Sequence, residues 1–231
     1  MKQLYFLVAF AILLSNCSTS LTYSPSLNLP NKPLEKGAVE LQGSAELFPE
    51  SRPEKVDNNV TFGLNGKLGY AFSDNFGVSV NGWLDAGNGS LDSRLGLAVN
   101  AQFIKHRSPT SRFIILPRFG FVNFGEGYGL SNSVIYHKEA SEKLSWYSGL
   151  GVAWGYSQLS KISLSSFEPP RYPFGYLAMG HLGMGYSLNS SIRVNLELNP
   201  IYQVNPVDNQ NHFFVAPSLG LGLVLNQKEK S

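Results

Sequence analysis

The residue types best suited to covalent chemistry gather around His181, with Ser187 and Glu197 following it in the sequence. A serine, a histidine and a carboxylate can act as nucleophile, general base and orienting group, so this set could hydrolyse an acyl ester. No sequence motif accompanies the three residues. The simpler interpretation is a histidine hydrogen-bonded within a polar interior. The leading hypothesis therefore assigns no catalytic residue, and an acyl hydrolase is kept as an alternative.

Acidic residues could indicate a metal site, and four of them recur at Glu40, Glu46, Asp85 and Asp92. Their spacing follows a two-residue alternation and matches no calcium-binding loop. The only cysteine, Cys17, excludes an internal disulfide framework and a cysteine-based metal cluster. The sequence therefore predicts neither a metal nor another cofactor, and the carboxylates are interpreted as balancing the arginines of the lumen.

Composition narrows the class of protein. The chain has 231 residues, 43% of them hydrophobic and 15% charged, which suits one ordinary domain. The formal net charge of +2 and the scattered lysines and arginines provide no electrostatic surface for nucleic acid. Glycine is abundant at 23 residues, and beyond the N-terminus no stretch has the 3.6-residue period of a helix. This composition is typical of β structure.

Most of the chain alternates with a period of two. Between Val60 and Phe72 the even positions are mainly large and apolar, whereas the odd positions are small or polar. Such alternation marks strands whose two faces meet different environments. The same pattern predicts ten strands, at about 37–48, 59–72, 76–86, 92–104, 112–124, 131–138, 143–157, 173–188, 192–204 and 212–225. The segment 131–138 is the weakest, so eight strands are the alternative.

Strand length and the polar face together favour a membrane. The alternating segments run about 11 to 16 residues, whereas a globular strand has about 5 or 6 and a tilted membrane strand needs about 9 to 11. The face opposite the apolar one carries many glycines and charges of both signs, which suits a crowded polar lumen. The predicted lumen residues are Lys67, Asp85, Arg94, Arg118, His181, Arg193 and Glu197.

The connections predict an orientation. Those after even-numbered strands are short, except for 105–111, whereas 158–172 is the longest of the others. Short periplasmic turns and longer outer loops are typical of outer-membrane barrels, and this places both termini in the periplasm. At eight to ten strands the lumen is filled by side chains, so we expect a plugged or narrow pore.

The N-terminus indicates export. Met1 and Lys2 precede an apolar run from Leu4 to Leu14, which has the length of a signal-peptide core and is too short to span a bilayer as a helix. Leu14-Ser15-Asn16-Cys17 resembles the bacterial lipobox, which implies lipid attachment at Cys17. The predicted organisation is a signal peptide at 1–16, the lipidated cysteine and a flexible tether at 17–36, a barrel at 37–226 and a polar tail at 227–231.

The hairpins around Leu116-Pro117-Arg118-Phe119-Gly120-Phe121 and Ala216-Pro217-Ser218-Leu219-Gly220-Leu221, with the alternation from Gly37 to Leu225, resemble those of small bacterial outer-membrane β-barrel proteins. The resemblance implies an all-β, closed, antiparallel up-and-down transmembrane barrel in the outer membrane. It also implies outer-membrane lipids and the barrel-assembly machinery as partners, while the extracellular partner stays unidentified.

The leading functional hypothesis is a non-enzymatic outer-membrane (lipo)protein with a structural, adhesive or ligand-contacting role through its extracellular loops, and not a wide general porin. Two alternatives remain. One is an outer-membrane lipid-modifying enzyme built on a barrel. The other is a periplasmic lipid-anchored barrel that binds a hydrophobic ligand inside, which would turn the apolar face inward.

Overall fold

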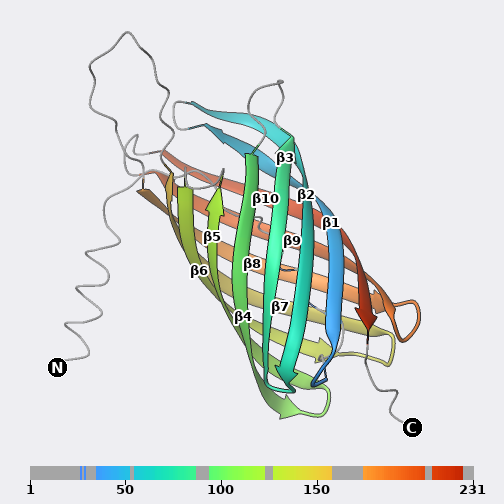
Figure 1. Ribbon diagram of the computed structural model, residues 1–231. Helices are drawn as coiled ribbons and strands as arrows, with labels where there is room; N and C mark the ends of the chain where they lie inside the picture. Colours follow the sequence, from blue (N-terminus) through green and yellow to red (C-terminus); the bar gives the residue numbers. More distant parts are fainter. Residues whose placement is uncertain are drawn as a thin grey trace, which may run out of the picture.

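In the computed structural model the chain folds into a single closed barrel (Figure 1). The structure describes residues 27, 29, 35–52, 55–86, 94–122, 127–157, 174–205 and 210–225. The ten strands are β1 (Val39–Arg52), β2 (Lys55–Ser73), β3 (Phe76–Ala86), β4 (Arg94–Ser108), β5 (Ser111–Val122), β6 (Gly127–Glu139), β7 (Leu144–Ser157), β8 (Phe174–Ser187), β9 (Ile192–Asn205) and β10 (Gln210–Leu225). In the described part of the chain, no helix is long and apolar enough to span a membrane.

Each strand pairs antiparallel with its neighbours in sequence, and β1 pairs with β10 to close the ring. Eight residue pairs make this closure, from Val39 opposite Leu225 to Glu46 opposite Ser218. The predicted fold is confirmed at ten strands, and the eight-strand alternative is wrong. The segment that looked weakest belongs to β6, which pairs with β7 along its whole length and with β5 from Gly127 to Lys138.

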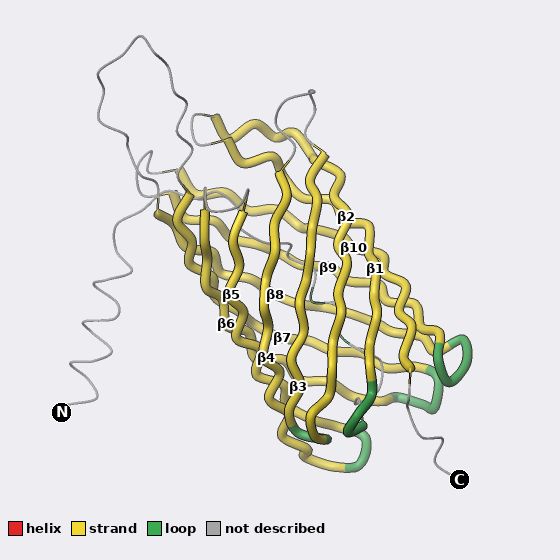
Figure 2. Tube along the Cα trace, viewed as in Figure 1, coloured by secondary structure: helices red, strands yellow, loops and turns green. Residues whose placement is uncertain are grey.

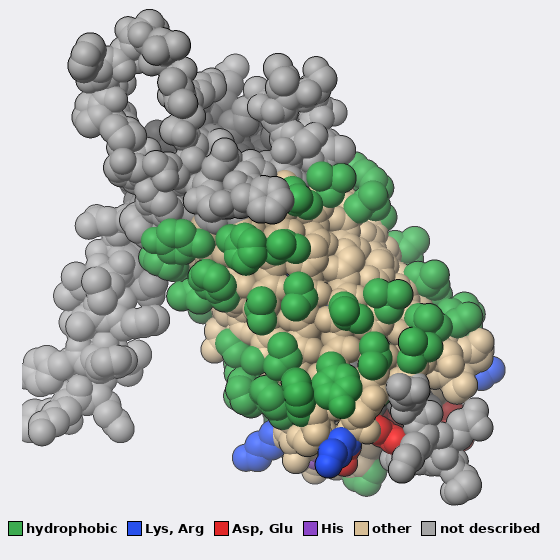
Figure 3. All heavy atoms as spheres, viewed as in Figure 1, with side chains coloured by type: hydrophobic (Ala, Val, Ile, Leu, Met, Phe, Trp, Pro, Cys, Tyr) green, Lys and Arg blue, Asp and Glu red, His purple; other side chains and the backbone are tan. Residues whose placement is uncertain are grey.

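The apolar face points outward. Phe62, Val152 and Leu221 are 48%, 64% and 59% exposed, whereas the side chains of Lys67 and Arg193 on the opposite face are buried. Figure 3 shows apolar side chains spread over the visible wall, with the charged ones gathered near one end. This orientation contradicts the alternative of a barrel with its apolar face turned inward around a hydrophobic ligand.

The described turns lie together at one mouth of the barrel (Figure 2). They are Asp74–Asn75, 109–110, 140–143 and 188–191. The predicted long connection at 105–111 is wrong, because β4 continues to Ser108 and leaves only two turn residues. Lys105, His106 and Arg107 are exposed and belong to β4, as charged side chains can at the end of a barrel strand beyond the apolar band.

Three prolines lie where the ladder is interrupted, because proline has no N–H to donate. The β4–β5 ladder lapses beside Pro117, and the β8–β9 ladder lapses beside Pro200. Among the described residues, the β1–β10 pairing stops at Ser218, next to Pro217. Each proline keeps a pairing position on its other side. The barrel thus accommodates the three prolines at local gaps and keeps its closure.

Aromatic side chains form a girdle near the short turns. Tyr70 contacts Phe72, and Phe72 stacks on Phe76 with ring centres 5.8 Å apart. The contacts continue from Phe76 to Phe103, and a second run links Phe113, Tyr136 and Trp146 across β5, β6 and β7. Amphipathic rings favour the boundary between lipid and water, so the girdle marks where an apolar band of this kind meets its interface.

Substituting arginine for an outward-facing leucine tests whether the outer wall of the barrel faces lipid or water. Leu150 lies midway along β7 and is 75% exposed. We expect Leu150→Arg to lower the free energy of unfolding by about 2 to 4 kcal/mol, because a charge at mid-bilayer is costly. Leu188→Arg, at the rim, should cost only about 0 to 1 kcal/mol. Urea unfolding in lipid vesicles measures both, and two equally neutral variants would mean that the wall faces water.

Candidate functional site

The candidate site is the polar interior of the barrel. Lys67, Arg118, His181, Arg193 and Glu197, all predicted from sequence as lumen residues, are buried on the inner face. The side chains of Asp85 and Arg94 lie outside the described residues, although both backbones belong to paired strands. Cys17 also lies outside the described residues.

A buried ion pair joins the first two strands. Lys67 Nζ on β2 lies 2.8 Å from Glu40 Oε2 on β1, and both side chains are almost fully buried. Two charges removed from water need each other, because an isolated buried charge has a large desolvation cost. Glu40 therefore belongs to the lumen as a counter-charge, and its partner in this ion pair is a lysine, whereas the sequence analysis expected arginines.

A ladder of asparagine side chains runs along the inner face of the barrel from β2 to β5. Asn81 Nδ2 donates to Asn65 Oδ1 at 3.3 Å, and Asn100 Nδ2 donates in turn to Asn81 Oδ1. Arg118 Nε closes the series by donating to Asn100 Oδ1 at 2.6 Å. Each asparagine can accept and donate at once, so the ladder satisfies buried polar groups on four neighbouring strands.

A serine, a histidine and an asparagine meet in the lumen across β6, β8 and β9. Asn199 Oδ1 accepts from His181 Nδ1 at 2.8 Å, which leaves His181 Nε2 to accept from the hydroxyl of Ser133 at 3.1 Å. The arrangement has the connectivity of a nucleophile, a general base and an orienting group. All three side chains are buried.

The predicted partners of His181 were different. Ser187 lies six residues further along β8, about 20 Å away at strand spacing. Glu197 meets Asn199, whose Nδ2 donates to Glu197 Oε2 at 3.5 Å. In the hydrogen-bonded series Glu197 is thus separated from His181 by Asn199.

A glycine keeps the space for this contact open. A Cβ atom on Gly151 would lie 2.3 Å from Ser133 Oγ and 3.1 Å from His181 Nε2. Either distance is shorter than an ordinary contact, so any larger residue at this position would push the serine and histidine apart. The glycines of the inner face here serve packing, as Gly183 also does by making room for the ring of Tyr147.

A second charged group lies near the short turns. Arg112 Nη1 lies 3.1 Å from Glu139 Oε1, and Arg112 Nη2 is 3.4 Å from His137 Nε2. The ring of His137 stacks on that of Tyr147, with centres 6.4 Å apart. Among the described residues, no group of three or more His, Cys, Asp or Glu side chains is placed to hold a metal ion.

Apolar residues also fill the lumen, which sequence analysis did not predict. One cluster contains Trp83, Ala153, Leu177, Met179, Ile201 and Ala216, and a second contains Leu27, Leu29, Ile114, Leu116, Ile135 and Tyr147. A signal was present at Phe113-Ile114-Ile115-Leu116, where an unbroken apolar run places large side chains on both faces.

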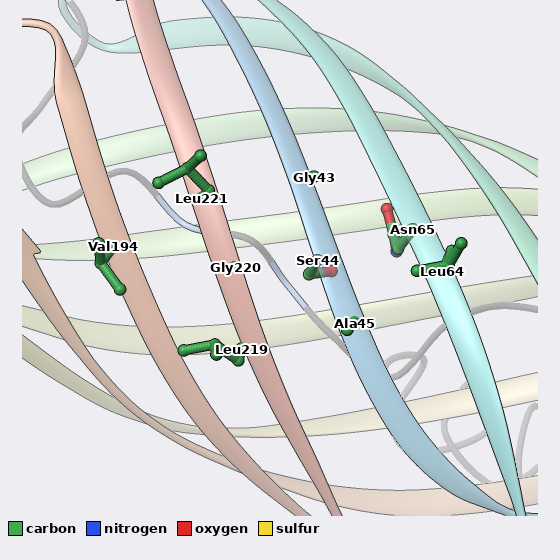
Figure 4. A pocket seen from close by; sticks show the side chains of 9 residues that line it. All are labelled: Gly43, Ser44, Ala45, Leu64, Asn65, Val194, Leu219, Gly220 and Leu221. Atoms are coloured by element: carbon green, nitrogen blue, oxygen red, sulfur yellow. The ribbon is translucent and has the colours of Figure 1, made fainter.

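The described pocket lies outside the lumen, on the wall at the seam of β1 and β10. It is a shallow apolar groove of about 500 Å³, lined on one side by Val194, Leu219 and Leu221 and on the other by Leu64. Figure 4 shows the small residues Gly43 and Ala45 on β1, between Leu64 on β2 and the leucines Leu219 and Leu221 on β10. The groove faces away from His181 and its partners, which lie on the inner face.

No protein-family model and no curated protein matches the chain. Solved barrels are similar in structure at low identity. The N-terminal β-barrel domain of OprF from Pseudomonas aeruginosa is 14% identical, with 82% of this chain and 98% of that chain covered and a TM-score of 0.38. Ail of Yersinia pestis, in complex with a heparin analogue, is 14% identical, with 82% of this chain and 99% of that chain covered and a TM-score of 0.39. The protease OmpT of Escherichia coli is 9% identical, with 89% of this chain and 99% of that chain covered and a TM-score of 0.43.

Removing one partner of the buried ion pair should be costly. We expect Lys67→Met to lower the free energy of unfolding by about 3 to 5 kcal/mol, because it strands the Glu40 carboxylate in the lumen. The double variant Lys67→Met/Glu40→Gln should recover most of that loss. Lys105→Met, at the exposed rim, is the matched control for loss of a lysine. Equal stabilities of the single and double variants would show that the pair is not coupled.

Proposed function

We propose that this chain is an integral outer-membrane protein with a barrel closed to bulk diffusion and a non-enzymatic role in contacts at the outer surface. The observation that carries the proposal is the pairing of an apolar exterior with a side-chain-filled interior. Leu64, Val99, Leu150 and Leu196 are among the apolar side chains that lie exposed around the wall. Such a surface is stable in lipid and would aggregate in water.

The interior supports closure of the pore. Glu40, Arg112, Ile135, Arg193 and Asn199 are buried inside a ring of only ten strands. A barrel of about eight strands is just filled by its own side chains, whereas open channels have about sixteen. We therefore expect a structural, adhesive or ligand-contacting protein rather than a general porin.

The orientation follows from the connections. The described turns of two to four residues share the mouth at which β1 begins and β10 ends. Short turns face the periplasm in outer-membrane barrels, so we place both ends of the barrel there. The connections at 87–93 and 158–173 join strands at the opposite mouth, and we assign the contacts with the exterior to that side.

Extraction tests the membrane assignment. Cys17→Ala removes the proposed lipid attachment, and we expect the variant to stay in the membrane fraction through carbonate and urea washes, because the apolar wall is itself the anchor. The wild-type protein serves as the control, and detergent should release both. Release of the variant by a wash without detergent would overturn the assignment.

Conductance tests closure in the same preparation. Reconstituted in a planar bilayer, the wild-type protein should conduct at least about tenfold less than a sixteen-stranded porin, because its ten-stranded lumen is occupied. A porin-like conductance would contradict a closed barrel while leaving the membrane assignment intact.

A second candidate function rests on one observation, the hydrogen-bonded order of Ser133, His181 and Asn199. Asn199 fixes the tautomer in which His181 Nε2 can take the proton of Ser133. The serine oxygen could then attack an acyl carbon, with the histidine returning that proton to the leaving alcohol. A substrate would have to enter the lumen, so this lipid-modifying activity ranks below the contact role.

A serine-reactive probe separates the two candidates. If the site is catalytic, a fluorophosphonate should label the wild-type protein, and Ser133→Ala should abolish labelling, because the activated hydroxyl is the nucleophile. Ser131→Ala, on the same inner face of β6, is the control and should leave labelling unchanged. His181→Ala should also alter the lipid A profile of the cells. Absence of labelling and an unchanged profile would eliminate the enzyme.

A further inference from the structure

Two leucines that precede the first strand lie inside the barrel. Leu27 and Leu29 are buried, at 4% and 1% exposure. They pack in one cluster with Ile114, Ile135 and Tyr147, which are inner-face residues of β5, β6 and β7. At these two residues the structure differs from the flexible tether that the Ser-, Asn- and Pro-rich composition predicts.

The backbone of this segment is bound by the wall. The N–H of Leu27 donates to Glu197 Oε2 at 2.9 Å, and Asn195 Nδ2 donates to the carbonyl oxygen of Leu29 at 3.1 Å. Glu197 and Asn195 are successive inner-face residues of β9, and each is buried. The acceptor Glu197 and the donor Asn195 are two residues apart on β9, and the leucines whose backbones they bind are also two residues apart. This spacing matches the two-residue repeat of an extended peptide.

The direction of the segment is fixed by these bonds. Glu197 lies two residues further from the short-turn mouth than Asn195, so Leu29 lies nearer that mouth than Leu27, in the order of a chain antiparallel to β9. Lys36 lies at the same mouth, where its N–H donates to Asp74 Oδ1 at 3.0 Å in the β2–β3 turn. Gly37, with a φ of 88°, reverses the chain into β1.

We propose that the inner face of β9 and the apolar cluster opposite form a binding site for an extended peptide, and that this chain's own Leu27 and Leu29 occupy it as an internal plug. The carboxylate of Glu197 and the amide of Asn195 hold the backbone, while Ile114, Ile135 and Tyr147 receive the leucines. The plug goes beyond the proposed function, because it specifies which part of the chain blocks the pore.

The Ser133, His181 and Asn199 series joins this site through Glu197. Asn199 donates to the same Oε2 atom that accepts from Leu27, at 3.5 Å. The orientation of the carboxylate is thus set from one side by the plug and from the other by the asparagine. The hydrogen-bonded series extends without a break from Ser133 to the backbone of Leu27.

The position of the plug is tested by a disulfide. In a Cys17→Ala background, Leu29→Cys with Asn195→Cys should form an intramolecular disulfide under mild oxidation, because Asn195 touches the backbone of Leu29. The control pair, Leu29→Cys with Asn81→Cys, places the second cysteine on the inner face of β3. We expect at least fivefold more cross-link in the first pair, seen as a shifted band on non-reducing gels. Equal yields, or none, would overturn the proposal.

Conductance tests whether the segment blocks the pore. Leu27→Asp/Leu29→Asp puts two carboxylates against Glu197 and the apolar cluster, so the segment should leave its site and the conductance should rise several-fold. Leu27→Met/Leu29→Met keeps the volume and should conduct like the wild type. Folding of each variant is checked by heat-modifiable migration on gels. A folded Asp variant with wild-type conductance would refute the plug.

The two experiments separate this proposal from the proposed function. The disulfide reports the location of Leu29 even in detergent, so it does not depend on the membrane in which the protein resides. A wild-type protein that conducts like a porin would contradict closure, whereas a closed wild type with an unchanged Asp variant would contradict only the plug.

Discussion

The structure depends on a closed sheet in which every strand has a hydrogen-bonded neighbour on both sides. Inside lipid each unpaired N–H or carbonyl costs several kcal/mol, so a sheet can be stable there only if it has no edge. The pairing of Val39–Glu46 with Leu225–Ser218 removes that edge, and the other nine strand pairs follow the order of the sequence. Once the ring is closed, the alternation along each strand decides which side chains face the lumen, because every second side chain must point inward.

The enclosed polar groups follow from that geometry. Inward side chains lose most of their water, so they must satisfy one another. Lys67 meets Glu40, and Asn100 links the ladder of asparagine side chains to Arg118. The pairing of His181 with Asn199 falls where the β8–β9 ladder lapses beside Pro200. Here the side chains of the two strands make the contact that the backbone does not.

Alternation was sufficient to predict the strands and their faces because it is a local property. The weak prediction for β6 has a physical cause. Asn132 lies on its outer face and Ile135 on its inner face, which reverses the pattern expected of a membrane strand. β4 continues past the predicted end at residue 104 to Ser108, because a charged side chain such as that of Lys105 does not end a strand that has already crossed the apolar band.

Contacts across the lumen could not be predicted in the same way. Ser133 and His181 are 48 residues apart, and their meeting depends on the register of β6, β7 and β8. Ser187 seemed a closer partner in sequence, yet it shares a strand with His181 and is kept from it by the rise of that strand. The burial of Leu27 and Leu29 is less predictable still, because a short polar stretch with two leucines has no period to detect.

The segment that carries Leu27 and Leu29 remains covalently joined to the wall that binds it, because Leu29 lies only ten residues before Val39 at the start of β1. A ligand attached through so short a linker experiences an effective concentration of about millimolar, however dilute the protein is. Washing or dilution therefore cannot deplete it. Occupancy becomes a unimolecular property of each molecule, set by the fit of two leucines and two hydrogen bonds.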